Sequence, residues 1–305
     1  MANIGCDVAQ DWVDFGVDSS VRRVARTKED LDLAMREFPA GSRLLLEPTG
    51  RYHRLVVECA QRAGLEVKLV DPYAFSLYRR SLSPRASTDK ICAQLLARFA
   101  EKEWDQVPEY RPLPKHLQRL KDLLEMRETQ TTLRVALQQS ISEVKGLPAS
   151  SNRALKSLER AVKDLELEIF ALVKSDPLFS EFKAIDGIGD LSAAAFVWLF
   201  RAFSFTNSDQ VVAFVGLDVR VRESGKFVGQ RKLTKRGPSL MRRLLYCSAN
   251  SLRRTEQFKP LFAKHHAKGL KTKGVNIIVA RRILRTAFEV ACHGARYERA
   301  RFYTP

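Results

Sequence analysis

Three acidic residues stand where a carboxylate is costly unless it is paired or binds a cation. Asp7 lies between the apolar residues Cys6 and Val8, Glu47 follows the apolar run 44–46, and Asp89 begins a helical segment. Taken singly, each is compatible with an exposed strand end or a helix cap, and a cap is the commoner role for Asp89. Taken together, the three carboxylates predict a site for divalent cations, Mg²⁺ or Mn²⁺, which prefer hard oxygen ligands.

The segments that must position these acids alternate between strand and helix patterns. Strands are predicted at 3–9, 12–18, 42–48 and 65–72, and helices at 28–38, 52–64 and 89–104. A tight connection joins the first two strands, so the sheet is expected to be mixed. The fold class is α/β followed by α, and residues 1–104 are predicted to form a ribonuclease-H-like (RuvC-like) domain. In such folds, acids from two strands and the next helix meet at one sheet edge and hold two divalent cations for phosphodiester chemistry.

A long helical part follows this domain. Pro108, Pro112 and Pro114 stop the preceding helix, so residues 105–178 are predicted to be a linker and a helical hairpin or coiled coil. In the second helix, apolar residues recur at alternating intervals of three and four, which is the spacing of a coiled-coil seam: Leu155, Leu158, Val162, Leu165, Ile169 and Leu172. An antiparallel hairpin packed on itself and a coiled coil between chains fit this pattern equally well.

The last part, residues 179–305, is expected to be a mostly helical, basic domain. From Arg220 to the end there are 22 Lys and Arg against 4 acids, whereas the rest of the chain has 30 bases and 31 acids. The whole formal excess of +17 therefore lies in this last segment, which predicts a nucleic acid partner. A solvated basic surface is the alternative. The turn at 185–189 resembles that of a helix-hairpin-helix, whose backbone N–H groups can face a phosphate.

Basic residues in and after a polar loop at 220–237 are the predicted contacts to nucleic acid: Lys226, Arg231, Lys232, Lys235, Arg236, Arg242 and Arg243. Arg253 and Arg254 follow about three helical turns later, so an unbroken helix would present both arginine pairs on similar faces. Fixed charge of this kind gives affinity and salt dependence rather than a choice of sequence.

Several classes of protein are excluded. No run approaches the roughly 18 consecutive apolar residues of a membrane span, and the first residues lack the pattern of a secretory signal. The five cysteines are scattered and never form a CxxC pair, which argues against a disulfide framework and a cysteine zinc site. We therefore expect a cytoplasmic protein with no membrane partner.

The sequence around the three acids resembles a known family. The segments GCDVAQ (5–10), LEPTGRYH (46–53) and STDKICAQLLARF (87–99) are similar to the catalytic blocks of the DEDD transposases of bacterial insertion sequences, which include the pilin-gene invertases. The second half is similar to the family's second domain in DGIGDLSAAAF (186–196), VAFVGLDV (212–219) and ESGKFVGQRKLTKRGPSLMRRLLYCSA (223–249). The six segments occur in the family's order over nearly the whole chain.

By this resemblance, Asp7, Glu47 and Asp89 correspond to the family's first three acids. The place of the fourth acid, three residues after Asp89 on the same helix face, is taken by Cys92. A neutral thiol is a poor ligand for Mg²⁺. The departure is compatible with weak binding of one metal, with an impaired copy or with an engineered variant.

The resemblance also implies a serine nucleophile in the C-terminal domain. Ser224 stands before a glycine, and Thr234 stands where the family usually has a serine before Lys-Arg-Gly. Ser224 is preferred, because its polar loop can present the hydroxyl to a phosphate while Lys226, Arg231 and Lys232 stabilise the developing charge. The ordinary alternatives are a turn residue for Ser224 and a helix N-cap for Thr234.

The leading hypothesis is a DNA transposase or recombinase that cleaves and rejoins strands with a metal-bound acidic cluster and a serine. Its expected partners are double-stranded DNA, a structured guide RNA that the resemblance suggests, and further copies of itself in a dimer or tetramer. The expected location is the bacterial cytoplasm, in association with the nucleoid. Two alternatives stay open: a RuvC-like structure-selective nuclease that uses water, and an inactive domesticated nucleic-acid-binding protein, which Cys92 would explain.

Overall fold

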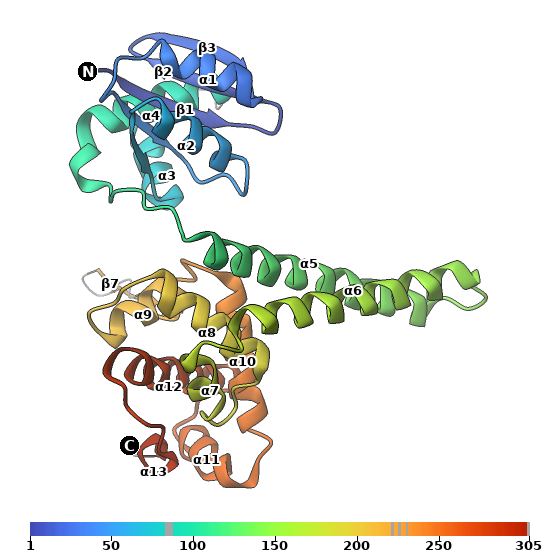
Figure 1. Cartoon of the computed structure of the whole chain (residues 1–305). Coiled ribbons are helices and arrows are strands. Elements are labelled where there is room, and N and C mark those ends of the chain that lie inside the picture. The colour runs from blue at the N-terminus through green and yellow to red at the C-terminus, as the bar shows by residue number, and fades with distance from the viewer. Residues whose placement is uncertain (83–87, 221–222, 225–226, 230, 304–305) are drawn as a thin grey trace. The chain divides into compact units, whose positions relative to one another are not determined.

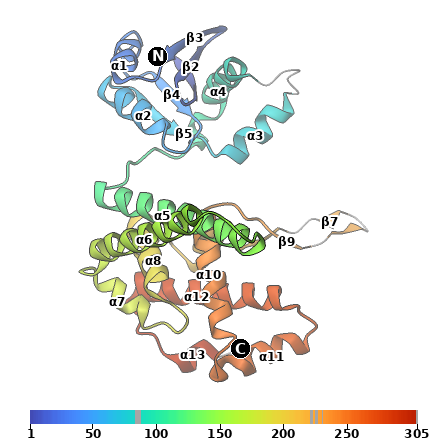
Figure 2. The same cartoon turned by 90° about the vertical axis from the view of Figure 1, so that its right-hand side faces the viewer.

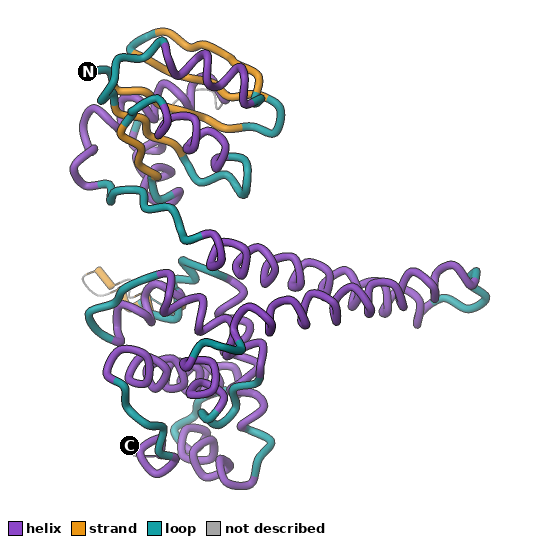
Figure 3. Tube along the Cα trace, viewed as in Figure 1, coloured by secondary structure: helices purple, strands orange, loops and turns teal. Residues whose placement is uncertain are grey.

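The computed structural model describes residues 1–82, 88–220, 223–224, 227–229 and 231–303, with the side chains of 223–224, 227–228 and 302–303 left out of the description. The chain forms two compact units, Met1–Pro112 and Leu113–Pro305 (Figure 1). Strands of the sheet lie in the first unit, and the second is mostly helical (Figure 3). The finer division at residues 104 and 178 stays a prediction.

A five-stranded mixed sheet organises the described part of the first unit. Its strands are β1 (Asn3–Val8), β2 (Trp12–Val17), β3 (Ser20–Ala25), β4 (Arg43–Leu46) and β5 (Glu66–Leu69), in the order β3-β2-β1-β4-β5. β1 is antiparallel to β2 and parallel to β4, and β4 is parallel to β5. The predicted mixed sheet is confirmed, and its topology is consistent with a ribonuclease-H-like domain. β3 was not predicted, because its residues are mostly exposed and polar.

Helices cover both faces of this sheet, as Figure 2 shows for α1 and α2 on one side and α4 on the other. The helices are α1 (Lys28–Arg36), α2 (His53–Arg62), α3 (Pro72–Ser81) and α4 (Asp89–Glu103), followed by the short 3₁₀ helix η1 (Trp104–Gln106). Along β1, Ile4, Cys6 and Val8 pack in the core with α1 and α2. The strand period of two therefore turns Gly5 and Asp7 toward α4.

Two glycines let α4 approach the sheet closely. Gly5 and Gly16 face each other across β1 and β2. A Cβ atom on Gly5 would lie 2.0 Å from the carbonyl oxygen of Ala93, and one on Gly16 would lie 2.6 Å from the same carbonyl group. Any other residue would push α4 away. Because Asp89 lies one turn before Ala93, this contact sets how near Asp89 comes to Asp7.

We expect Gly5→Ala to lower the free energy of unfolding by about 2–3 kcal/mol, because the methyl group has no space against the α4 backbone. Urea unfolding followed by circular dichroism measures this change. Gly274→Ala is the matched control, since the nearest atom to its Cβ, on Leu270, is 4.0 Å away. Equal midpoints for the two variants would show that the glycine contact does not set the packing of α4.

The second unit begins with a helical hairpin of α5 (Lys115–Glu143) and α6 (Ala149–Val173). The two helices run side by side (Figure 1) and are joined by ion pairs such as Arg127–Glu166, with Nε 2.9 Å from the carboxylate. Most of the predicted seam of α6 is buried or half-buried, but Leu172 is exposed and Val173 is buried in its place. The hairpin prediction is thus confirmed, while a coiled coil between chains stays a prediction.

The rest of the second unit is helical around one core, as predicted. Its elements are α7 (Pro177–Lys183), α8 (Asp190–Ala202), α9 (Ser208–Val215), α10 (Ser239–Leu252), the 3₁₀ helix η2 (Glu256–Phe258), α11 (Lys259–Ala267), α12 (Thr272–His293) and α13 (Arg299–Tyr303). Between α9 and α10 lie two-stranded ribbons: β6 (Val219–Arg220) with β9 (Lys232–Leu233), and β7 (Glu223–Ser224) with β8 (Phe227–Val228). None of the described helices is long and apolar enough to cross a membrane.

Candidate active site

The three predicted acids lie close together at one edge of the sheet. Asp7 pairs with Asp14 across β1 and β2, and the β1–β4 register brings Glu47, one residue past the end of β4, to the same edge. Asp89 joins them from the first turn of α4. Burial, together with the negative charges of Asp89, Glu47 and Asp14, raises the pKa of Asp7 to about 6. The four carboxylates therefore form one electrostatic cluster.

Asp14 is a fully buried member of this cluster that sequence reasoning missed. Its carboxylate accepts two hydrogen bonds from Arg23, at 2.9 Å from Nε and 2.7 Å from Nη2. The guanidinium carbon of Arg23 also lies 4.6 Å from the ring centroid of Trp12. Such a bidentate pair satisfies a buried carboxylate and fixes the guanidinium in place. The sequence signal that could have identified Asp14 is the register of the first hairpin, which places Asp14 opposite Asp7.

Asp89 is held by the same arginine and tryptophan. Its Oδ2 atom lies 3.3 Å from Arg23 Nη2 and 3.3 Å from Trp12 Nε1. The cap of α4 is the side chain of Thr88, which accepts a hydrogen bond from the backbone N–H of Ile91. A helix cap is the commoner role for an acid at the position of Asp89, but here Thr88 has that role.

Arg79 lies on the other side of the cluster, beside Glu47 and Cys92. Burial raises the pKa of Glu47, and the positive charge of Arg79 opposes that rise. Arg79 Nη1 lies 3.7 Å from the Sγ atom of Cys92. Because Arg79 comes from α3, a helix that was not predicted, its place beside the cluster was not predicted either. A guanidinium group therefore stands beside the position that the family pattern reserves for the fourth acid.

The donor chemistry of this cluster fits a hard divalent cation, since carboxylate oxygens from three chain segments converge on Asp7. Within the described residues, no three His, Cys, Asp or Glu side chains stand in an arrangement that would already hold a metal ion. Asp89 is turned toward Arg23 and Trp12. Cation binding at this edge therefore requires Asp89 to exchange those contacts for the ion.

The raised pKa of Asp7 gives a pH dependence that can be measured without activity. Its folded pKa of about 6 exceeds the ordinary value of 3.8, so between these values the folded state binds more protons than the unfolded state. In EDTA, the contribution of Asp7 to stability is therefore expected to fall as pH rises from about 4 to about 6. Urea midpoints of the protein and of Asp7→Asn, compared at pH 4.5 and 7.5, measure it. Parallel pH profiles for the two proteins would contradict the expectation.

The base of the predicted DNA-contacting loop is closely packed. Lys235 N donates to Gly216 O at 3.1 Å, and a Cβ atom on Gly237 would lie 1.9 Å from Phe214 O. The hydroxyl of Thr234 donates a hydrogen bond to the carboxylate of Asp218. The alternative role of Thr234, as cap of the following helix, is not found, because the N-cap of α10 is Pro238.

The structure describes some of the other predicted residues of this region and not others. Ser224 belongs to the short strand β7, and its side chain is outside the described set, as is the whole of Lys226. Arg231, Lys232, Lys235 and Arg236 are all exposed, in and around β9 and in the segment before α10. Their contact with nucleic acid stays a prediction.

Arg242 and Arg243 have contacts within the protein. Arg242 Nη1 donates to the carbonyl oxygens of Val215 at 3.0 Å and Gly237 at 2.8 Å, and Arg243 forms an ion pair with Glu128 of α5. Since α10 ends at Leu252, the later pair 253–254 lies beyond the helix. The condition of an unbroken helix, on which the two arginine pairs would share a face, is therefore not met.

Comparisons with known sequences agree with this architecture. A family model described as transposase of the IS116/IS110/IS902 family matches residues 180–266, and a transposase model of the IS110 DEDD type matches residues 16–144. The pilin gene-inverting protein of Moraxella lacunata is 26% identical over 258 residues, covering 81% of this chain and 79% of that protein. The pilin gene-inverting protein of Moraxella bovis is 25% identical over the same lengths. In both of its units this chain is similar to the DEDD transposases of bacterial insertion sequences.

The similarity to these transposases supports the three acids to different degrees. The match to the DEDD model includes the positions of Glu47 and Asp89 but begins at residue 16, after Asp7. The place of Asp7 in the cluster is therefore supported by the sheet register and by its perturbed pKa.

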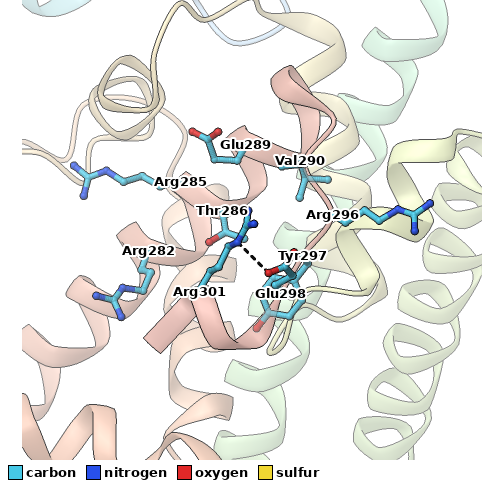
Figure 4. A pocket seen from close by; sticks show the side chains of 10 residues that line it. Arg282, Arg285, Thr286, Glu289, Val290, Arg296, Tyr297, Glu298 and Arg301 are labelled. Atoms are coloured by element: carbon cyan, nitrogen blue, oxygen red, sulfur yellow. Dashed lines mark ion pairs between the residues drawn. The ribbon is translucent and has the colours of Figure 1, made fainter. Parts of the chain in front are cut away.

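A second cluster of charged side chains in the second unit lies against α12. A cavity of about 280 Å³ is lined by α12 and the segment after it, and Arg282, Arg285 and Arg301 surround it (Figure 4). Arg285 forms an ion pair with Asp209, and Arg301 pairs with Glu298. Part of this positive charge is thus neutralised within the protein.

The helix-hairpin-helix-like turn is also occupied by an internal contact. The carboxylate of Asp186 accepts hydrogen bonds from Tyr297 at 2.9 Å and from both Nε and Nη2 of Arg299. These bonds to Asp186 tie the C-terminal segment to the turn between α7 and α8. A phosphate contact at this turn would have to form beside that ion pair.

Proposed function

We propose that this protein is a DNA transposase or recombinase that cleaves and rejoins strands, using the acidic cluster with divalent cations and Ser224 as the nucleophile. The observation that supports it most is the convergence of Asp7, Asp14, Glu47 and Asp89 at one sheet edge in a chain that is similar to a transposase family. Mg²⁺ or Mn²⁺ bound there would position a DNA phosphate and offset the charge that develops on it. Asp7, Glu47 and Asp89 are the proposed ligands.

The proposed chemistry is a transfer of a phosphoryl group between hydroxyls. The Ser224 oxygen forms a bond to phosphorus, the bond from phosphorus to the DNA oxygen breaks, and that oxygen takes up a proton in place of the one lost by the serine. The hydroxyl of another DNA end reverses these steps and frees the serine. Each phosphate ester bond that breaks is replaced by another, so breakage and rejoining need no external energy source and no other reactant.

The expected DNA contacts come from the second unit. Lys226, Arg231, Lys232, Lys235 and Arg236 would lie along the phosphates of double-stranded DNA, giving affinity that falls steeply with salt. Arg242 and Arg243 stabilise this region through their bonds to Val215, Gly237 and Glu128. Both arginines are proposed to contact DNA while they keep those bonds. We expect a dimer or tetramer to act in the bacterial cytoplasm, at the nucleoid.

A covalent adduct tests the serine step. With nicked duplex DNA and Mn²⁺, this protein is expected to become trapped on the DNA if Ser224 is the nucleophile, because the broken strand diffuses away before rejoining. The adduct is measured as a band that shifts in denaturing gels and disappears after protease treatment. Cleavage without any adduct would instead identify a RuvC-like nuclease that uses water. No cleavage at all would favour an inactive nucleic-acid-binding protein.

Guidance by RNA is tested separately. If a structured RNA selects the target, sequencing of the nucleic acid that co-purifies with the protein is expected to return one discrete RNA. Random fragments would contradict guidance and would be explained by the positive charge of the second unit alone.

A further inference from the structure

A cavity of about 350 Å³ lies in the second unit and is lined by residues of α5, α8 and the first turn of α10. Its apolar lining includes the buried side chains of Leu124, Trp198 and Met241. Its polar lining includes Glu125 and Ser239, which are exposed. Apolar walls with a few polar groups, in a volume of this size, are typical of sites that take up a small organic group.

Trp198 contributes an indole N–H group that the protein leaves unsatisfied. The side chain is 5% exposed, and its Nε1 atom is buried with no hydrogen-bond partner among the described residues. A buried donor of this kind is costly, because its bond to water is lost and nothing replaces it. The ring itself packs edge-to-face against Phe203, with 5.6 Å between the ring centroids. An occupant of the cavity with an acceptor atom would satisfy the indole N–H group.

The first turn of α10 adds backbone donors to the same cavity. The helix begins at Ser239 after the N-cap Pro238, and no side chain of the described residues caps it. The backbone N–H groups of a first turn have no partners inside their own helix. Ser239, Leu240 and Met241 of this turn all line the cavity. Donors from α8 and from α10 therefore belong to one cavity.

The charged residues at the cavity are balanced. Glu125 forms an ion pair with Lys121, with 3.7 Å between Nζ and the carboxylate, and Glu128 forms one with Arg243. The two carboxylates can accept further hydrogen bonds, since each has two oxygens with several acceptor sites. A cavity with balanced charge, donors and acceptors favours a neutral occupant that carries both kinds of group.

We propose that this cavity takes up one unpaired base of the bound DNA, turned out of its stack. A base has flat apolar faces that match the apolar walls, and an edge with both acceptors and donors. The cavity also begins where the predicted DNA-contacting loop 220–237 ends, because Pro238 lines it and Arg236 is exposed two residues earlier. A strand that follows the charges of the loop therefore passes beside the cavity. The inference goes beyond the proposed function and rests on it only in taking DNA as the partner.

The binding of three DNA duplexes to the full-length protein tests this proposal. The first has one extra, unpaired base in one strand, the second has an abasic residue in place of that base, and the third is fully paired. Fluorescence anisotropy in EDTA measures their affinities without cleavage. The duplex with the unpaired base is expected to bind about tenfold more tightly than the abasic duplex, because the two differ only in the base itself. The fully paired duplex is expected to bind like the abasic one.

Two variants change the cavity, and a third is the control. Trp198→Phe removes the N–H group and keeps a ring, so the tenfold preference is expected to fall to about threefold. Its urea midpoint should not fall, since the N–H group has no protein partner to lose. Ser239→Leu puts a larger side chain at the cavity and is expected to abolish the preference. Ser251→Leu makes the same change at an exposed position in the last turn of α10, and the full preference is expected.

Equal affinities of the wild type for the base-containing and abasic duplexes would overturn the proposal. An unchanged preference in both Trp198→Phe and Ser239→Leu, with each folded by circular dichroism, would also overturn it. A preference seen only with RNA duplexes of the same design would overturn the assignment to DNA.

The measurement is independent of strand exchange. If the preference is found but Asp7→Asn and Ser224→Ala exchange strands normally, the proposed function fails and the base site stands. If those variants lose strand exchange while the wild type does not distinguish the duplexes, only the base site is lost.

Discussion

Asp7→Asn is expected to lower the rate of DNA strand exchange about a thousandfold while leaving the affinity for DNA nearly unchanged. Asp7 is the residue on which the other three carboxylates act, so its loss removes the proposed central ligand of the cluster. A loss of about 4 kcal/mol in the stabilisation of a charged transition state corresponds to about a thousandfold in rate. Single-turnover strand exchange and gel-shift titration measure the two quantities on the same DNA.

Asp11→Asn is the control for this prediction, because Asp11 is exposed in the connection of the same hairpin. Its activity is expected to match the wild type. The Asp7→Asn protein should also be at least as stable as the wild type at neutral pH in EDTA, since a buried and repelled carboxylate has been neutralised. Full activity in Asp7→Asn would remove the acidic cluster from the mechanism.

The acidic cluster was predictable because its signal is local. An acid inside a short apolar strand has few physical explanations, and the period of two in β1 shows which face Asp7 occupies. Asp7, Glu47 and Asp89 could therefore be assigned to one sheet edge from their segments alone. Family resemblance then connected them to phosphodiester chemistry.

The groups that neutralise the cluster were not predictable, because their signal is long-range. Arg23 lies on β3, an exposed edge strand with no clear alternation, and Arg79 lies on α3, a helix that the patterns did not indicate. Neither residue differs in sequence from the many other arginines of the chain. Only the folded structure shows that Arg23 donates hydrogen bonds to the Asp14 carboxylate and that Arg79 contacts Cys92.

The same limit applies to the basic second unit. Composition correctly placed the excess charge, but it treated every arginine as available to DNA. Arg243 is paired with Glu128, a residue 115 positions away, and Arg242 binds backbone carbonyls. Charge counts therefore predict the kind of partner better than they predict which side chains meet it.

Ser224→Ala is expected to lower strand exchange by about ten-thousandfold or more, because it removes the hydroxyl that is proposed to form the covalent bond to phosphorus. The protein should still bind DNA, bind Mn²⁺ and fail to form the covalent adduct on nicked substrate. Thr234→Ala separates the two candidate hydroxyls. Since the Thr234 hydroxyl donates a hydrogen bond to Asp218, its loss is expected to cost about 1–2 kcal/mol of stability and to change the rate less than tenfold.

The outcome identifies the nucleophile, because each variant removes one of the two candidate hydroxyl groups of this loop. If Thr234→Ala abolishes the adduct and Ser224→Ala does not, the hydroxyl bound to Asp218 is the nucleophile and the carboxylate is in place to accept its proton. If both variants form the adduct at the wild-type rate, the covalent step uses neither side chain. If neither variant changes cleavage and no adduct forms with the wild type, water is the nucleophile, and the acidic cluster of the first unit is sufficient for the chemistry.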